Sequence, residues 1–460
     1  MRGRRGRGSG VVGIFFLAVI VVLAGCGYYL YTSKIFERNA PVINLSNQIY
    51  WNLKSSIPLI IKDDTGIKSA KVSLSDGSKK INLIDTKFDI IKPEVKLEIS
   101  LPKGTLLDKS ANYQLEIEAN DVSKWNFFTG NKLDALINVV VDTQRPDIYV
   151  LNQSYKITRG GAAAVVFRAS DEMLKELYIE TNTKKQFKVT PFHKDGYYAS
   201  LVAWPASEDS FSAYVIAKDM AGNENRTRIK YYLQDKKYKV SNIALNDEFL
   251  GGKITDLVNR YAQDPSQIQG VAKFKFVNET LRNQSEGAIG SKTKDVLEDS
   301  LNKFFLKPFY PLKNGQAVAS FGDHRFYSMN KEPVSESWHL GLDLASIAGA
   351  PIIASNDGEV VFADEDGIYG LGVAVYHGFG LYSLYAHCSS SNVKVGDKVK
   401  AGEVIAHTGS SGLAFGDHLH FGVIIQGVEV RPEEWMDKKW MEDNIYKILE
   451  NSRKSIDSRK

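Results

Sequence analysis

The sequence contains few cysteines and no excess of basic residues outside its amino terminus. Two cysteines in 460 residues cannot build a disulfide framework, and C-x-x-C zinc-binding pairs are absent. The net charge of +4 is local, because residues 1–10 hold four arginines and no acid, which leaves 54 basic against 54 acidic residues elsewhere. Nucleic-acid binding requires a basic face and not a basic tail. We therefore expect no nucleic-acid partner.

Several catalytic motifs are also missing. The chain has no H-E-x-x-H and no P-loop, and Gly409-Ser-Ser-Gly412 does not have the spacing of G-x-S-x-G. A glycosidase that uses two carboxylates leaves no local signature, so composition and motifs alone do not exclude it.

Charge is absent between Arg7 and Lys34. The apolar run at 11–32 would form about 33 Å of helix, enough to cross a hydrocarbon core of about 30 Å. The arginines of the basic tail (1–10) should remain in the cytoplasm, and Tyr28, Tyr29 and Tyr31 suit the membrane interface. The sequence predicts a single-pass protein of the bacterial cytoplasmic membrane, with its bulk in the periplasm or outside.

Two other amino-terminal arrangements compete with the spanning helix. Leu23-Ala-Gly-Cys26 resembles a lipobox, with Cys26 as the acylated residue of a lipoprotein, although the apolar run continues after the cysteine. A cleaved signal peptide is the third arrangement. All three place the body of the protein outside the cytoplasm.

An internal repeat follows the apolar segment. The stretch Pro41–Asn47 is echoed by Pro146–Asn152, and Tyr113–Asp121 corresponds to Ser212–Asp219. Short alternating runs between Gly, Asn, Asp and Ser favour β-sandwiches, and units of this size are typical of immunoglobulin-like domains. We expect two Ig-like modules, at 40–142 and 143–236, which act as a spacer or contact another envelope protein.

Residues 237–305 have helical rather than strand-like spacing. We expect helices at 247–261 and at 293–305, the second with Thr293 as its N-cap. This helical connector should pack on one neighbour or lie across a cleft. A further helix is expected within 433–460, after Pro432.

Histidines are concentrated in one region. Seven of the eight lie between His324 and His420, where even scattering would place about two. Histidine is a common zinc ligand and acid–base group, so this concentration favours a metal or catalytic site. The surrounding glycine turns and short Val/Ile-rich strands predict a compact antiparallel β-domain at 306–432.

Strand alternation brings some of these side chains together. Within 339–343 and within 418–420, the terminal polar residues would share one strand face, because side chains alternate with period two. A third segment with a candidate histidine is Leu384-Tyr-Ala-His387. Two histidines and one carboxylate around zinc, with the fourth position open, would make a catalytic site.

Five segments in this region resemble the LytM/lysostaphin-type zinc metallopeptidases, which cut peptidoglycan peptides. The resemblance covers about 316–432, and the segments occur in the family's order: Trp338–Ala345, Ala350–Val360, Leu384–His387, Val395–Gly402 and Gly416–Phe421. It departs from the family at Asp417, where proline is frequent, and at Gly422, where an acidic or polar residue is frequent.

The resemblance implies a zinc endopeptidase domain that binds one Zn²⁺ per chain. It implies that His339, Asp343 and His420 are the metal ligands, and that His387 and His418 handle the proton of water and the developing oxyanion. The other histidines match no functional position, and we expect Cys388 to be a small buried thiol.

The expected fold is multidomain and mainly β: a transmembrane helix, two Ig-like modules, a helical connector, an antiparallel zinc-peptidase domain and a final helix. The expected function is hydrolysis of peptidoglycan peptides by a membrane-anchored metalloendopeptidase. The alternative is a catalytically silent member of the same family that activates another cell-wall hydrolase. A complete ligand set favours the enzyme, since regulatory members usually lose it.

Overall fold

The computed structural model describes residues 9–108 and 111–459, and it is mainly β, as expected. The described residues form two compact units. The first consists of residues through Arg145 together with Lys218–Asn223, and the second of Pro146–Ala217 together with the chain from Glu224 onward. The domain boundaries expected from the sequence stay predictions, since compactness alone does not test each of them.

An apolar helix begins the described chain. Helix α1 (Ser9–Thr32) contains a candidate membrane span, Val12–Thr32, whose mean hydropathy is 2.3 and whose side chains are exposed. The short helix η1 (Lys34–Phe36) follows it. The four arginines of the predicted cytoplasmic tail lie outside the described residues.

The first β-module consists of two sheets that enclose one core. A three-stranded sheet and a five-stranded sheet form this module. Trp51, Val72 and Ile117 are buried in its core. The β2–β8 pair is parallel, and the other pairs are antiparallel. A helical turn, α2 (Trp125–Phe128), interrupts the last hairpin. In sheet order, the strands are β1 (Val42–Ile43), β3 (Ile57–Lys62) and β6 (Glu94–Ile99), then β2 (Gln48–Trp51), β8 (Lys132–Val141), β7 (Tyr113–Asp121), β4 (Ile67–Ser75) and β5 (Lys80–Lys87).

The second β-module also has two sheets, each of four strands. In order, they are β14 (Thr190–Pro191), β15 (Tyr197–Ala203), β11 (Ala162–Ser170) and β9 (Asp147–Gln153), then β13 (Gln186–Lys188), β12 (Leu174–Thr181), β16 (Ala213–Asp219) and β17 (Glu224–Ile229). A separate parallel pair joins β10 (Lys156–Thr158) to β18 (Tyr232–Gln234). The immunoglobulin-like character of both modules stays a prediction.

The connector is helical, but its second helix lies earlier than expected. The predicted helix at 247–261 is present. The one predicted at 293–305 is wrong, because Thr293 ends a helix instead of starting one and donates its hydroxyl proton to the Ile289 carbonyl. The elements are β19 (Val240–Ala244), α3 (Asp247–Phe249), η2 (Leu250–Ile254), α4 (Thr255–Tyr261), η3 (Pro265–Gln267), α5 (Val271–Lys275), η4 (Phe276–Leu281) and α6 (Arg282–Lys292).

The histidine-rich region is built on an eight-stranded sheet, as the predicted antiparallel domain requires. Its order is β20 (Gln316–Ala319), β23 (Leu342–Ala345), β31 (Leu419–Ile425), β27 (Leu381–Cys388), β26 (Gly370–Tyr376), β25 (Gly358–Asp366) and β29 (Lys398–Val399), with β32 (Val428–Val430) on β31. Two smaller sheets complete it: β24 (Pro351–Ile353), β30 (Val404–His407) and β28 (Ser390–Ser391), and β21 (His324–Met329) with β22 (Glu332–Trp338) and the connector strand β19.

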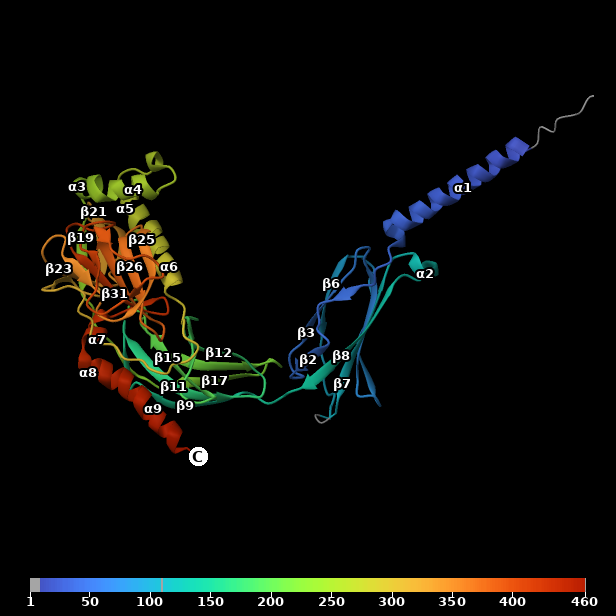
Figure 1. The fold of residues 1–460 in the computed structure, drawn as a ribbon, viewed down its shortest axis with the longest axis horizontal. Helices are drawn as coiled ribbons and strands as arrows, with labels where there is room; N and C mark the ends of the chain where they lie inside the picture. The colour runs from blue at the N-terminus through green and yellow to red at the C-terminus, as the bar shows by residue number, and fades with distance from the viewer. Residues whose placement is uncertain (1–8, 109–110, 460) are drawn as a thin grey trace, which may run out of the picture. The chain divides into compact units, whose positions relative to one another are not determined.

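The last helices join this domain to the second β-module. Helix α9 lies along β9 and β11 (Figure 1), and backbone carbonyls of the final helices accept hydrogen bonds from Asn152 and Ser154. Buried side chains of the module, the large sheet and these helices form one contiguous core. The second unit is therefore a single packed body. The helices are α7 (Pro432–Met436), α8 (Lys438–Met441), η5 (Glu442–Tyr446) and α9 (Lys447–Ser458).

Candidate metal centre

Two neighbouring strands of the large sheet bring the predicted ligands together. Strands β23 and β31 run antiparallel, and Asp343 lies directly opposite His420. Alternation along β31 turns Leu419 and Phe421 to the opposite face, where both are fully buried in the core. The sequence predicts that His339 and Asp343 lie on one strand. His339 instead lies in the loop that precedes β23. The loop still directs its ring at the other two residues.

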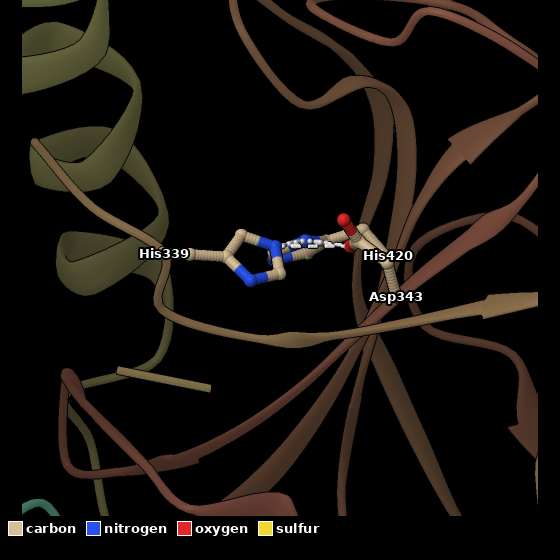
Figure 2. Close-up of side chains that lie close together, drawn as sticks. All are labelled: His339, Asp343 and His420. Atoms are coloured by element: carbon tan, nitrogen blue, oxygen red, sulfur yellow. Dashed lines mark hydrogen bonds and ion pairs between the residues drawn. The ribbon is translucent and has the colours of Figure 1, made fainter. Parts of the chain in front are cut away.

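The three side chains point toward one another (Figure 2). Oδ1 of Asp343 lies 3.0 Å from Nε2 of His339 and 2.9 Å from Nδ1 of His420, and the two ring nitrogens are 3.2 Å apart. Ligands of a tetrahedral zinc ion, each about 2.0–2.2 Å from the metal, lie roughly 3.3–3.6 Å from one another. The observed separations are slightly shorter than that range, and two imidazoles with one carboxylate are a donor set that zinc uses in catalytic sites.

The protonation of His339 agrees with a role as metal ligand. Its Nδ1 lies 2.9 Å from the Ser320 carbonyl oxygen, which can only accept a hydrogen bond. Nδ1 must therefore carry the proton, and the lone pair of Nε2 faces Asp343 and His420. Such a bond to the second nitrogen is how proteins orient histidine ligands.

Asp343 is held as a carboxylate. Burial alone would raise the pKa of Asp343, but its close contacts with the His339 and His420 rings outweigh it, so its pKa lies well below the usual range. Burial lowers the pKa of His420. Both conditions leave the donors with free lone pairs at neutral pH, which is the state that binds a metal.

Gly341 makes the close approach of His420 feasible. A Cβ atom at this position would lie 2.4 Å from Cε1 and Nε2 of the His420 ring. The chain between His339 and Asp343 thus passes against the face of that ring, and only a residue without a side chain fits there.

The two predicted proton-handling histidines lie beside the trio. The rings of His387 and His418 are 4.9 Å apart, and His387 is 5.6 Å from the His420 ring. The Nδ1 atoms of His387 and His418 each lie 2.9 Å from a backbone carbonyl, those of Ser411 and Gly416. As in His339, the carbonyl fixes the Nδ1 proton and leaves Nε2 as the basic atom. Nε2 of His418 lies 3.7 Å from Oδ2 of Asp343.

His387 reaches the site through an unusual backbone conformation. It is the last residue but one of strand β27 and has a φ of 62°, a left-handed value that costs a residue with a side chain about 1–2 kcal/mol. Burial, followed by the charges of His420 and His418, lowers the pKa of His387 to about 3. Cys388 lies in the core on the other side of the sheet, so the buried thiol expected from the sequence is confirmed.

Asp417 occupies the position at which the sequence departs from the family pattern. Its carboxylate accepts hydrogen bonds from the Gly349 amide and the Thr408 hydroxyl. These bonds tie the loop that carries His418 to the neighbouring β-segments. Asp417 therefore fixes the backbone beside His418. A proline at this position could not do so, because it has no side-chain acceptor.

All five predicted side chains line a pocket of about 390 Å³. One of its walls comes from the connector, which sequence reasoning did not assign to the site. Phe249 stacks on Phe415 with ring centroids 4.8 Å apart, while Arg282 and Glu286 add an ion pair with a separation of 3.6 Å. The connector carries no motif, so nothing in the sequence signalled this contribution.

The connector wall is part of a buried core. Leu281 and Ile289 pack with Ala374, Leu384 and Ile424 from the face of the large sheet that also carries His420. Moving these helices away would expose fully buried side chains of the sheet. The connector is therefore a fixed component of the pocket wall. The sequence left open whether it packs on one neighbour or lies across a cleft, and the buried contacts show packing.

Sequence reasoning also missed Tyr369. Its ring lies 5.6 Å from that of His420, and its hydroxyl donates a hydrogen bond to Glu429. Burial, followed by the charge of Glu286, raises the pKa of Glu429 to about 8. Tyr369 thus packs beside the His420 ring and is bonded to Glu429, whose pKa is also raised by the charge of the connector residue Glu286.

The remaining histidines lie outside the trio and its two neighbours. His377 is buried between the Asp357 carbonyl and the Ser383 hydroxyl, and His324 stacks on Trp338. His407 lies near Ser390, and His193 near Asp457. None of these four lines the pocket.

Comparison with known families decides the identity of this region. Residues 337–432 match the model described as peptidase family M23. The C-terminal region is an M23 peptidase domain. The resemblance to LytM/lysostaphin-type enzymes is thereby confirmed, and the M23 match contains all five side chains of the site.

Three relatives show the range of proteins that contain an M23-like region. DD-carboxypeptidase/endopeptidase Mpg of Neisseria meningitidis is 38% identical over 108 residues, which is 23% of this chain and 25% of Mpg. Peptidoglycan DD-endopeptidase ShyA of Vibrio cholerae is 24% identical over 357 residues, 72% of this chain and 80% of ShyA. Murein hydrolase activator EnvC of Escherichia coli is 40% identical over 98 residues, 21% of this chain and 23% of EnvC. The chain spans only about a quarter of the length of Mpg and of EnvC.

Proposed function

We propose that this protein is a membrane-anchored zinc metalloendopeptidase that hydrolyses peptide bonds of peptidoglycan in the bacterial envelope. The observation that carries the proposal is the convergence of three candidate ligand atoms beside two histidines whose Nδ1 atoms are held by backbone carbonyls. Relatives named as peptidoglycan endopeptidases support the substrate class.

His339, Asp343 and His420 would hold the zinc ion. When bound, zinc supplies a water whose pKa is lowered to about 7 and polarises the scissile carbonyl. Nε2 of His387 or His418 would accept the proton of the attacking water and return it to the leaving amine. The other histidine would donate a hydrogen bond to the developing oxyanion once its Nε2 also carries a proton, since its ring lies beside that of the first.

The pocket would exclude water from the reacting bond. Its volume accommodates a short peptide segment, and its walls combine apolar rings with Arg282 and Arg325. Arg282 is paired with Glu286 and Arg325 with Asp323, so the charge of the lining is mixed.

The alternative is a catalytically silent activator of another hydrolase, a role that the name of EnvC gives to that relative. Zinc content and cleavage by the full-length protein separate the two functions. An enzyme should contain close to one zinc per chain and release muropeptides from purified peptidoglycan. A protein that contains no zinc and releases none would be a regulator.

The membrane anchor can be tested separately. A reporter fused after Lys34 should be active only on the outer side of the cytoplasmic membrane, because the arginine-rich tail remains inside. Mass spectrometry of the amino terminus then distinguishes the three arrangements. An acylated Cys26 would replace the spanning helix with a lipid anchor, and a cleaved terminus would indicate a signal peptide.

A further inference from the structure

The last hairpin of the first β-module differs from its counterpart in the second. Both hairpins are closed by an aspartate–asparagine pair with the same bonds: Asn131 donates to Asp121 through its backbone and side-chain nitrogens, and Asn223 does so to Asp219. Residues 220–222 bridge the second pair, whereas residues 122–130 bridge the first. The first module therefore carries an insertion, which we name the aromatic loop (Val122–Gly130).

The aromatic loop directs apolar rings into solvent. Phe127 is 98% exposed and Phe128 is 72% exposed, and neither belongs to the module's core. Three successive residues, Asn126 to Phe128, have left-handed φ values of 51°, 56° and 71°. Residues with side chains rarely adopt this conformation, and it persists only where surrounding contacts enforce it.

Local hydrogen bonds enforce this conformation. The Asn126 side chain donates to the Gly130 carbonyl, and the Thr129 hydroxyl donates to the Asn126 carbonyl. The loop is closed on itself while its two phenylalanine rings remain outside. Folding of the module alone gives no reason for exposing them.

Contacts also fix the aromatic loop to the end of helix α1. The Lys124 amide donates to the Ile35 carbonyl at 2.7 Å. The Arg38 guanidinium lies 4.7 Å from the Tyr31 ring and 4.5 Å from the Trp125 ring, and it joins the last turn of α1 to the loop. The rings of Phe36 and Phe128 are 6.4 Å apart.

A second apolar tip lies at the same end of the module. Strand β4 pairs Ile67 with Asp121 and Ser69 with Lys87, so the turn after β5 lies at the end where the aromatic loop begins. Ile90 in that turn is 73% exposed. Lys34, Arg38 and Lys124 lie near the exit of α1 together with an acidic group of Glu37, Asp63 and Asp121, so the aromatic rings and not a net charge favour the membrane contact.

We propose that the aromatic loop is a second membrane-contacting element, which inserts Phe127 and Phe128 into the lipid headgroup region beside α1. The inference rests on the proposed spanning of the membrane by α1. Once Thr32 lies at the interface, a loop bonded to residues 31–38 lies within the headgroup layer, because a helix rises only about 1.5 Å per residue. Aromatic side chains are favoured in that layer. The loop would set the orientation of the first module on the membrane.

Lipid-depth quenching tests this proposal on the full-length protein. The protein would be reconstituted in vesicles of phosphatidylethanolamine and phosphatidylglycerol, in a Cys26→Ala background. Buried Cys388 does not interfere, because it is 1% exposed. A Phe127→Cys variant would carry an environment-sensitive fluorophore. We expect blue-shifted emission, quenching by spin-labelled lipids and protection from aqueous iodide.

Two further positions make the outcome decisive. Leu106 is the matched control, because it is equally apolar, 96% exposed and precedes the opposite end of β7. A label introduced by Leu106→Cys should be quenched by iodide alone. A label introduced by Val21→Cys reports on α1 itself: lipid quenching at 21 without quenching at 127 would overturn the loop proposal and leave the anchor intact.

Absence of lipid quenching at both 21 and 127 would instead overturn the spanning helix. A label at 127 that becomes protected only after envelope proteins are added would identify a protein partner, and it too would overturn the lipid assignment. A Phe127→Ser/Phe128→Ser protein should keep its zinc content and its activity on soluble muropeptides. In this protein, a label at position 90 and a label at position 106 should differ less in lipid quenching than in the unsubstituted protein, since the module loses its fixed orientation.

Discussion

His377 and His387 are buried to a similar extent, yet their environments differ in one respect. Both lie in the M23 domain with Nδ1 against a backbone carbonyl, and burial lowers the pKa of each, to about 4 and about 3. Nε2 of His377 is bonded to the Ser383 hydroxyl at 2.7 Å. His387 instead lines the pocket, beside His418 and His420.

The difference shows that burial alone does not identify a functional histidine. A ring whose two nitrogens are both satisfied by the protein contributes to stability. A ring oriented by one nitrogen, with the other open to a pocket, can bind or transfer a proton. Four predictions test this distinction, from the largest expected effect to the smallest.

Removing a ligand should abolish metal binding. Asp343→Ala or His339→Ala should reduce zinc from close to one per chain to close to none, with hydrolysis at background, because each change removes one of three protein donors. Elemental analysis with a muropeptide-release assay measures both. His377→Ala is the control and should retain its zinc; loss of zinc there would remove the distinction between the two classes.

Removing a proton-handling histidine should separate binding from catalysis. His387→Ala and His418→Ala should keep nearly all their zinc while kcat/KM falls by roughly 10²–10⁴-fold, the usual range for lost acid–base help. If His418→Ala lost zinc as completely as His420→Ala, the proposed ligand set would be wrong. Unaltered hydrolysis in both variants would assign the chemistry to another group.

Crowding a ligand ring should weaken the site without removing a donor. Gly341→Ala would place a methyl group 2.4 Å from the His420 ring, which must then shift. We expect zinc affinity to fall by about 10–100-fold, the range typical of disturbed ligand orientation. Competition with a chelator measures the change. Gly396→Ala, in open space, controls for the loss of glycine, although its positive φ adds some strain.

The buried, satisfied histidine should affect stability and not activity. The pKa of His377 is about 4 in the folded protein, below its unfolded value of 6.5, so the unfolded chain binds the proton first as pH falls. The stabilising contribution is present above pH 6.5 and decreases toward pH 4, by about 3 kcal/mol in total. His377→Gln should flatten this part of the pH profile of Tm, with kcat unchanged at neutral pH. A profile identical to that of the unsubstituted protein would show that a group other than His377 causes the pH dependence of Tm in this range.

Local sequence was sufficient to predict the apolar helix and the convergence of His339, Asp343 and His420. An uninterrupted apolar run has only one regular backbone arrangement that satisfies its polar groups in a membrane. Alternation in 418–425 placed His420 opposite the core-facing Leu419 and Phe421, and the ordered segments around it indicated the family. The apolar run is contiguous and each family segment is short, so these signals are readable from neighbours along the chain.

Only the tertiary structure showed what surrounds that site. Arg282 and Glu286 reach the pocket because the connector buries Leu281 and Ile289 on the large sheet, a contact between segments far apart in sequence. The predicted helix at 293–305 is wrong for the same reason, because its helical spacing describes only neighbouring residues. The chain is not helical there. Propensity and periodicity describe neighbours along the chain, whereas burial against a distant surface decides which of the locally feasible structures forms.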